Sequence, residues 1–472
     1  MTGRARLVES CSGVPMNDGM DAPKALILAL EDWPLAAYMA LALRRSGFSV
    51  ASLCPRDHPL HHTDAVDQCY GFSRAHPLRD LSTAIRGTSP ALLVPCDDQS
   101  TYAIYDLYER CRRGGGEDAA TTMSLIERSL GNPESFEIAR KKSLFLRIAR
   151  ECGISFPETS EIGSLAELKA HCAAASFPVV LKQDGTFGGL GVIVARDRKG
   201  AEAAYHRLAV RSKVNAGREL LKQFNLRPAL RLMTAPPAII SMQSFVEGRP
   251  ANSAVACWRG HVLARATVVT LEARPAPNGP ATVVEFIRNA EIDRAVDTLV
   301  ARLGLSGFCG FDFMLDGRSD RAYLLELNPR ATSASWLGMK PKSDLCAALY
   351  RAVTGRDGVG AAEEAEAPGE RAALFPQEWA RQKDSEHVNA SYHRVPWEDP
   401  RLVSYLVATA MKSGREHKIG LASRLARRFI LGRGWDLRPE HGEKVVVAIN
   451  PRPEYRAPLD RSPQGSIRDR RA

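Results

Sequence analysis

The distribution of hydrophobic and polar positions divides the chain, from Lys24 onward, into short apolar runs that alternate with amphipathic segments. Continuous apolar runs of this length predict buried strands, and apolar side chains spaced three to four residues apart predict helices. The expected strands are residues 24–30, 48–54 and 91–96, and the expected helices are residues 35–46, 78–86 and 99–112. Strands and helices that alternate at this spacing predict a parallel α/β sheet.

The turn after the first predicted strand lacks the motif of a dinucleotide site. Rossmann-like folds that bind a dinucleotide carry GxGxxG between the first strand and the first helix, where glycines let the backbone approach the phosphates. The corresponding residues here, 30–34, read LEDWP. We therefore predict a Rossmann-like domain without a dinucleotide site at this turn.

A predicted β-hairpin at residues 307–330, GFCGFDFMLDGRSDRAYLLELNPR, carries the clearest chemical signal. Two apolar runs flank a polar turn, and side chains alternate between the two faces of a strand. A hairpin centred on Ser319 places Asp312 directly opposite Glu326, and Asn328 lies on the same face as Glu326. Two facing carboxylates among apolar residues repel each other and lose hydration unless a cation lies between them. Oxygen ligands of this kind suit Mg²⁺. The alternative is an edge hairpin whose polar face meets solvent.

A glycine-rich turn between two short apolar runs is the second signal. Residues 177–182, FPVVLK, end in Lys182 and lead into residues 184–191, DGTFGGLG, before the run 192–195. Such a turn lets backbone N–H groups surround phosphate oxygens, and a lysine beside it supplies a cation. A flexible hairpin turn with a surface lysine explains the same pattern equally well.

Two further segments have less specific patterns. Lys142 belongs to a predicted helix at residues 133–152, where a basic residue usually lies on the solvated face. Residues 239–248, IISMQSFVEG, predict a strand that ends at a glycine. Such a strand either belongs to the core or offers its backbone to an adenine edge.

Composition indicates an ordinary globular protein, since 44% of its 472 residues are hydrophobic and 25% are charged. The ten cysteines are scattered without a CxxC pair, and the first residues lack the apolar segment of a signal peptide. We therefore expect a cytoplasmic protein with no transmembrane segment. The net charge is +10, and nearly all of the excess lies after Pro400. A basic tail of this kind is usually solvated, so we expect no nucleic-acid partner.

The order of these motifs resembles that of the ATP-grasp superfamily. A lysine precedes GIxxP, then come PVVLK with the glycine-rich turn, a strand ending in EG, and finally DF with ELNPR. The ELNPR segment is similar to the carboxylate-amine ligase and carbamoyl-phosphate-synthetase-like branch. The resemblance implies a Rossmann-like N-terminal domain followed by an ATP-grasp fold (α/β and α+β), with a mainly helical C-terminal extension.

The expected division of the chain follows from this resemblance and from composition. We expect a disordered segment (1–22), a Rossmann-like domain (23–130), an ATP-grasp domain (131–356, with a lid at about 145–246), an acidic linker (357–372), a helical extension (373–450) and a basic disordered tail (451–472). The extension includes a predicted helix at residues 400–412 and a basic amphipathic helix at about 420–431. We expect the latter to pack on the protein, and contact with a partner or a membrane surface is its alternative.

The resemblance also implies a role for particular residues, with ATP as the nucleotide and one or two Mg²⁺ ions (or Mn²⁺) as the metal. The expected metal ligands are Asp312, Glu326 and Asn328. The expected catalytic residues are Arg330 and Lys182, with Arg288 as a weaker candidate for the role of Arg330. The expected nucleotide contacts are Lys142, Lys182, Gly185, Thr186, Gly188, Gly189, Gly191, Gln243, Ser244, Phe245 and Val246.

Three positions depart from the family pattern. Lys141 stands where many relatives have Asp, Gln243 stands where Glu is frequent, and Pro250 stands at the position of a common acidic ribose ligand. These differences affect the expected affinity for nucleotide and leave the expected metal ligands and lysines in place.

The implied activity is activation of a substrate carboxylate as an acyl phosphate, with release of ADP, followed by attack of an amine. Small-molecule carboxylate and amine substrates are the expected partners, and a homodimer is compatible with the sequence. Two alternatives stay open. One is a bicarbonate-activating enzyme of the carboxylase or carbamoyl-phosphate type, and the other is an ATP-binding scaffold without catalytic activity.

Overall fold

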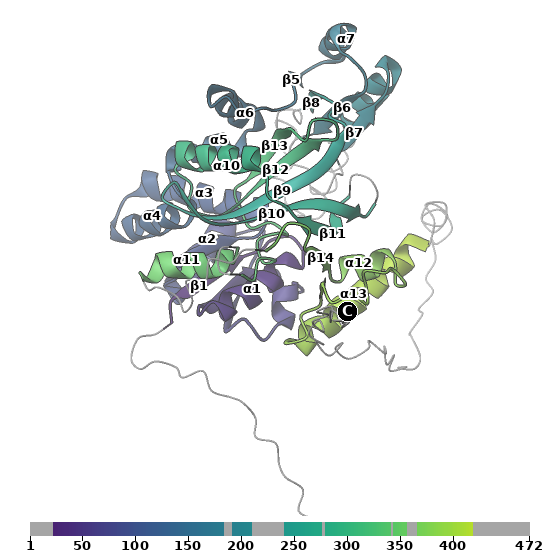
Figure 1. The fold of residues 1–472 in the computed structure, drawn as a ribbon. Helices are drawn as coiled ribbons and strands as arrows, with labels where there is room; N and C mark the ends of the chain where they lie inside the picture. The colour runs from purple at the N-terminus through teal and green to yellow at the C-terminus, as the bar shows by residue number, and fades with distance from the viewer. Residues whose placement is uncertain are drawn as a thin grey trace, which may run out of the picture.

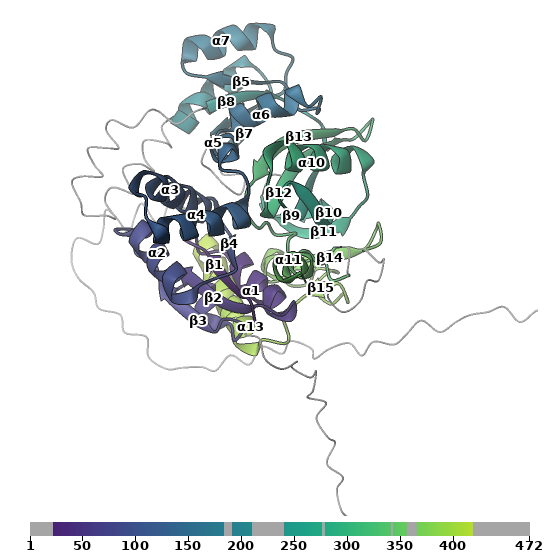
Figure 2. The same ribbon diagram turned by 90° about the vertical axis from the view of Figure 1, so that its left-hand side faces the viewer.

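The computed structural model describes residues 22–183, 191–209, 240–275, 279–340, 343–355 and 366–418, with side chains up to residue 411 in the last range. Figures 1 and 2 show three sheets: an N-terminal sheet, a small sheet and a large sheet to which the C-terminal segment also contributes.

The N-terminal region is the predicted parallel α/β domain. Its sheet has the order β3-β2-β1-β4, and every pairing is parallel. The strands are β1 (Lys24–Leu28), β2 (Ser49–Cys54), β3 (Gln68–Gly71) and β4 (Leu92–Pro95), and the helices are α1 (Leu35–Arg45), α2 (Pro77–Thr88), α3 (Asp98–Gly114) and α4 (Glu117–Leu130). The sequence pattern missed β3, a largely exposed edge strand, and α4, which follows the glycine turn 114–116.

The predicted helix at residues 133–152 is interrupted. A 3₁₀ turn (Pro133–Ser135) and α5 (Phe136–Arg140) precede Lys141, whose backbone is extended with φ −112° and ψ 109°. Helix α6 (Lys142–Glu151) then begins. Because of this break, Lys142 lies at the start of a helix instead of on the side of a longer one.

The small sheet has the order β5-β8-β6-β7 and is antiparallel throughout. Its strands are β5 (Thr159–Ile162), β6 (Val179–Gln183), β7 (Val192–Ala195) and β8 (Ile240–Ser244). One face packs against α7 (Leu165–Ala174) and the helical residues 198–209 through an apolar cluster that includes Leu168, Leu181 and Ile240. Lys182 alternates with Leu181, so its side chain lies on the opposite face.

The large sheet has the order β13-β12-β9-β10-β11-β14-β15. Its strands are β9 (Gly248–Trp258), β10 (His261–Ala273), β11 (Ala281–Phe286), β12 (Gly307–Asp316), β13 (Ala322–Asn328), β14 (Arg371–Leu374) and β15 (His393–Arg394). One face packs on α10 (Ala290–Leu303) and α6 around Phe311 and Phe313. The other face is rich in alanine and packs on the N-terminal domain and α11 (Leu345–Thr354). Small side chains let these layers approach closely.

The C-terminal segment joins both domains. Strand β14 pairs with β11, so residues 371 and 372, which we had placed in the acidic linker, belong to the sheet. Glu366 is buried and accepts hydrogen bonds from the backbone N–H groups of Met339 and Lys340. Helix α12 (Gln377–Arg381) follows, and α13 (Pro400–Lys418) includes the predicted helix at 400–412.

The remaining C-terminal predictions, the basic helix at about 420–431 and the tail, lie outside the described residues, as does most of the predicted N-terminal segment. Within the ranges given above, no helix is both long and apolar enough to cross a membrane.

The docking of this segment on α1 gives a testable prediction. Tyr38 is buried, stacks on Trp336 at 4.2 Å and donates a hydrogen bond to the carbonyl of Phe375. Tyr38→Phe leaves that carbonyl without its donor, so we expect the free energy of unfolding to fall by about 1–3 kcal/mol. Tyr405→Phe is the matched control, because its hydroxyl bonds the carbonyl of Asp57 at an exposed position. Equal effects in urea titrations of the two variants would contradict this account.

Candidate active site

The β12–β13 hairpin brings the two predicted carboxylates together. Asp312 and Glu326 are directly paired residues of the two strands, as the sequence predicted. The register shifts by one residue after Asp312, so the pairing beyond it toward the turn differs from that of a regular hairpin centred on Ser319. Asn328 pairs with Gly310 at the end of β13. The two carboxylates therefore face each other across adjacent strands of the large sheet.

Asp312 is held by two amide groups. Asn252 Nδ2 donates to its Oδ1 at 2.6 Å, and Asn328 Nδ2 donates to its Oδ2 at 2.9 Å. Burial and the adjacent Glu326 carboxylate raise the pKa of Asp312 to about 7, against the lowering effect of these hydrogen bonds. The pair thus tends to retain a proton, which is the expected response of two carboxylates that lack enough positive charge between them.

Two lysines approach the carboxylate pair from different elements. Lys142 Nζ, at the start of α6, lies 3.5 Å from Glu326 Oε2. Because β13 is the edge strand, the start of α6 can reach Glu326 past the edge of the sheet. Lys182 comes from β6 of the small sheet. Burial alone would raise the pKa of Glu326, but the charges of Lys142 and Lys182 outweigh burial and lower it.

The two lysines also affect each other. Burial and the neighbouring Lys142 ammonium lower the pKa of Lys182 to about 8, although Glu326 and Asp312 act in the opposite direction. Two cations held this close need anionic partners, and here the Glu326 and Asp312 carboxylates supply that charge. A polyphosphate that binds together with a divalent cation would give both lysines further anionic partners without adding a large excess of negative charge.

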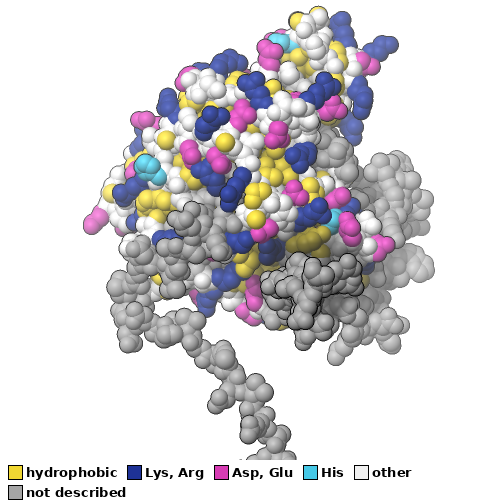
Figure 3. All heavy atoms as spheres, in the orientation of Figure 1, with side chains coloured by type: hydrophobic (Ala, Val, Ile, Leu, Met, Phe, Trp, Pro, Cys, Tyr) yellow, Lys and Arg dark blue, Asp and Glu magenta, His cyan; other side chains and the backbone are white. Residues whose placement is uncertain are grey.

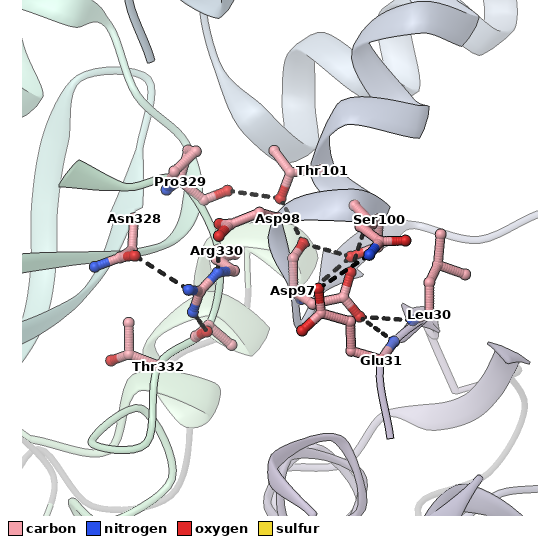
Figure 4. A network of polar contacts seen from close by, with 12 residues as sticks. Leu30, Glu31, Asp97, Asp98, Ser100, Thr101, Asn328, Pro329, Arg330 and Thr332 are labelled. Atoms are coloured by element: carbon pink, nitrogen blue, oxygen red, sulfur yellow. Dashed lines mark hydrogen bonds and ion pairs between the residues drawn. The ribbon is translucent and has the colours of Figure 1, made fainter. Parts of the chain in front are cut away.

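Arg330 links this site to the N-terminal domain (Figure 4). Its Nε donates to Asp98 Oδ1 at 2.7 Å, and one terminal nitrogen donates to Asn328 Oδ1 at 3.1 Å. A third hydrogen bond goes to the carbonyl of Ala331. Burial opposes the charged form, yet Asp98 raises the pKa of Arg330. The guanidinium has five N–H groups, so these three bonds leave donors for a substrate.

Asp98 is fixed by the geometry of its helix. It is the first residue of α3, and Asp97 caps that helix by accepting from the N–H of Ser100 at 2.7 Å. The other oxygen of Asp97 accepts from the N–H groups of Leu30 and Glu31 after β1. Figure 4 shows this chain of contacts running from the β1 turn to Arg330. The LEDWP turn, which carries no dinucleotide motif, thus supports the residue that holds Arg330.

Two residues of this site, Asn252 and Asp98, were not predicted from the sequence. Asn252 lies next to Ser253 near the middle of β9, and a polar residue in a strand was the signal in the sequence that could have indicated it. Its pairing with Asp312 joins strands 60 residues apart in the chain, so local patterns could not reveal it. Asp98 is 232 residues from Arg330 and looks like an ordinary acidic residue in the first turn of a helix.

The predicted hinge residues follow β8. Gln243 is buried, and its Nε2 donates to Thr159 Oγ1 at 2.9 Å, so this side chain is directed toward β5. Ser244 and Phe245 are exposed, and Val246 is half-buried. Their predicted contact with adenine remains a prediction.

The remaining predicted site residues either lie outside the described residues or have no described contact with the carboxylate pair. Gly185, Thr186, Gly188 and Gly189 lie outside the described residues, while the carbonyl of Gly191 accepts from the N–H of Gln183. Arg288 is exposed after β11, and β9 and β10 separate that strand from β12. No contact between Arg288 and the carboxylate pair is found among the described residues, and its role beside Arg330 remains a prediction.

The donor set fits Mg²⁺ in its chemistry. Two carboxylates and an amide offer oxygen ligands, and the raised pKa of Asp312 indicates a need for positive charge between the carboxylates. In the structure, however, Asn328 directs its amide nitrogen to Asp312 and its oxygen to Arg330. For Asn328 to act as a metal ligand, its side-chain amide must therefore flip so that Oδ1 faces the carboxylate pair. Among the described residues, no group of three or more His, Cys, Asp or Glu side chains is arranged to hold a metal. The remaining ligands would be phosphate oxygens and water.

Comparison with known proteins supports this interpretation of the fold. Residues 139–334 match the ATP-grasp domain family. The chain is 23% identical over 238 residues to the carbamoyl phosphate synthase arginine-specific large chain of Geobacillus stearothermophilus, a match that covers 48% of this chain and 20% of that relative. The chain therefore spans about a fifth of the length of this curated relative.

Solved structures show the same fold at low sequence identity. The biotin carboxylase domain dimer of Hydrogenobacter thermophilus 2-oxoglutarate carboxylase, in complex with MgADP, ADP and bicarbonate, matches with a TM-score of 0.51 and 13% identity over 72% of this chain and 71% of that chain. The β-γ-ATP complex of Campylobacter jejuni biotin carboxylase also matches with a TM-score of 0.51, at 14% identity over 71% of this chain and 72% of that chain.

The lowered pKa of Lys182 gives a prediction for nucleotide binding. The ammonium is charged below about pH 8 and loses its charge above it, so we expect the affinity for MgATP to fall as pH rises past 8. Lys182→Arg keeps the charge and should move this fall to higher pH. Lys141→Arg, at the exposed residue paired with Glu137, is the control and should leave the profile unchanged. Isothermal titration calorimetry across this range measures the effect, and a flat wild-type profile would contradict it.

Proposed function

Because residues 139–334 of this chain form an ATP-grasp domain, the domain of an ATP-dependent ligase and carboxylase family, we propose that the protein activates a substrate carboxylate with ATP and joins it to an amine. The observation that carries this proposal is the facing pair Asp312 and Glu326, with Lys142 and Lys182 beside it and Arg330 next to Asn328. These groups form an electrostatic site for phosphoryl transfer.

The proposed reaction has two steps. A carboxylate oxygen of the substrate attacks the γ-phosphorus of ATP, the bond from that phosphorus to the bridging oxygen breaks, and ADP leaves. The nitrogen of the amine then attacks the acyl carbon, the bond to the phosphate oxygen breaks, and inorganic phosphate leaves as the amine loses a proton. The product is an amide or a peptide bond.

Each group of the site has a role in this scheme. Lys142 and Lys182 bind the phosphates and offset their charge, and Arg330 orients the substrate carboxylate or the transferred phosphoryl group. Asp312, Glu326 and Asn328 would hold Mg²⁺, which supplies charge neutralisation at the β- and γ-phosphates when bound. The small sheet carries Lys182, and in this proposal it helps to exclude water from the reactive intermediate.

A second candidate is activation of bicarbonate. Two observations favour it: the sequence match to a carbamoyl phosphate synthase and the fold match to a carboxylase domain that binds MgADP and bicarbonate. The same carboxylate pair and lysines would serve it, with bicarbonate as the attacking oxygen donor. That structural relative is also a dimer, and a dimer of this chain remains a prediction.

Analysis of nucleotide products tests the proposal. Purified protein is incubated with ATP, Mg²⁺ and either pooled amino acids and small carboxylic acids or bicarbonate alone, and the nucleotides are separated by chromatography. We expect ADP that depends on the pool, while ADP that depends on bicarbonate alone would support the second candidate. AMP with pyrophosphate would contradict both, and Mg²⁺-dependent ATP binding without any product would favour the scaffold alternative.

Glu326→Gln is the matched loss-of-function variant for that assay. It removes a charge from the carboxylate pair without changing the size of the side chain, so we expect turnover to fall by at least about a hundredfold. The melting temperature should change little. Glu134→Gln, at an exposed position before α5, is the control and should retain full activity. Loss of activity in both variants, or in neither, would contradict the assigned role.

The contact between Asp98 and Arg330 gives a further prediction. Asp98→Asn keeps the shape of the side chain but removes the charge that orients the guanidinium, so we expect kcat to fall by about tenfold or more while the KM for ATP changes little. Asp98→Glu should restore part of the activity. A rise in the KM for ATP with unchanged kcat would show that Arg330 acts in nucleotide binding instead.

A further inference from the structure

A pocket of about 200 Å³ lies between α6 and strands β5 and β8, next to the candidate active site. Its lining includes Lys142, which also contacts Glu326, together with Arg147 and Arg150 from the same helix. Thr159, Glu161 and Ser241 form the wall contributed by the sheet. Figure 1 shows α6 beside these strands. The volume is below that of typical nucleotide or drug-sized sites, so a ligand here is small.

Ser241 is the first observation that points to a ligand. Its side chain lines the pocket and is buried, with 4% of the residue exposed. Its hydroxyl has no hydrogen-bond partner among the described residues. The neighbouring Gln243, on the same face of β8, is satisfied by Thr159. Buried hydroxyl groups are nearly always paired, so an unpaired one on a pocket wall indicates a missing acceptor or donor.

The charge of the pocket is the second observation. Lys142, Arg147 and Arg150 supply three cations, and Glu161 is the one carboxylate among the lining residues. Arg150 lies over the ring of Phe156, another lining residue, at 5.3 Å. In the ranges that the structure covers, no ion pair within 4 Å is found for Arg147, Arg150 or Glu161. The excess of unpaired positive charge favours an anionic ligand.

We propose that this pocket binds a small anion with a carboxylate or phosphoryl group, which accepts hydrogen bonds from Ser241 and pairs with Arg150 and Lys142. The consequence for nucleotide binding rests on the proposed function. Because Lys142 would then serve two anions, the ligand competes with the ATP phosphates for this lysine, and its binding weakens the affinity for ATP. The pocket is thus a regulatory site that senses a small acid.

Binding is tested without nucleotide, so its outcome does not depend on the proposed reaction. Inorganic phosphate and succinate are each titrated into the full-length protein by calorimetry. The variants are Ser241→Ala and Arg150→Gln, with Arg198→Gln as a control for an exposed arginine of the lid that pairs with Glu202. We expect one or both anions to bind the wild type and the control equally, and about tenfold more weakly to each pocket variant.

The anion that binds with the higher affinity shows whether the pocket prefers a phosphoryl group or a carboxylate. Equal affinity in all four proteins would place the anion elsewhere, for example on the lysines of the carboxylate pair, and would overturn the proposal. Absence of binding to the wild type would overturn it as well. Melting curves without ligand show that the variants fold, and Ser241→Ala should be at least as stable as wild type because it removes an unpaired buried hydroxyl.

The link to nucleotide binding is measured separately. In the wild type we expect the binding anion to weaken the affinity for MgATP, and in Ser241→Ala we expect this effect to be largely lost while the affinity without anion is unchanged. An anion that binds the pocket but leaves the affinity for MgATP unchanged would overturn the shared role of Lys142.

Discussion

The mutual repulsion of Asp312 and Glu326 is the constraint around which the site is arranged. Paired strands hold the two carboxylates against each other, and the burial of Asp312 raises its pKa to about 7. Such a pair persists in a folded protein only where other groups supply positive charge or donate hydrogen bonds. Asn252 and Asn328 donate to Asp312, while Lys142 and Lys182 stabilise the charge of Glu326.

These supporting groups come from separate parts of the fold, which explains why the site needs the whole architecture. Lys142 lies at a helix start created by the break at Lys141, and Lys182 lies on the small sheet. Arg330 follows β13 and is held by Asp98 of the N-terminal domain. The alanine-rich face of the large sheet packs closely on that domain. Because of this packing, the strand that carries Glu326 and the helix that carries Asp98 keep a fixed spacing.

Local patterns predicted the parts of the site that local geometry determines. The alternation of β12 and β13 and the length of their turn were enough to pair Asp312 with Glu326. The parallel sheet and the strand positions of Lys182 and Gln243 followed from apolar runs in the same way. The bulge after Asp312 was not foreseen, because its cause is the fit between two strands and not the composition of either.

Local sequence patterns could not predict contacts between segments that lie far apart in the chain. Asn252 meets Asp312 only because β9 lies beside β12, and Asp98 meets Arg330 only because the two domains pack together. Helix propensity favoured a continuous helix through Lys141, yet the chain is extended there and α6 begins at the lysine that reaches Glu326. The backbone thus departs from its local helical preference at Lys141, directly before the lysine that reaches Glu326.

The balance of charge in the site bears on how a nucleotide would enter it. Lys142, Lys182 and Arg330 face the three carboxylates of Asp312, Glu326 and Asp98, so the protein groups nearly cancel one another. A polyphosphate adds several negative charges to this balanced set. Free nucleotide would therefore leave excess negative charge near Glu326, whereas nucleotide that arrives with a divalent cation brings its own compensation. In the proposed function, the carboxylate pair would thus make the cation a condition of nucleotide binding, because without it the carboxylates and the phosphates repel each other.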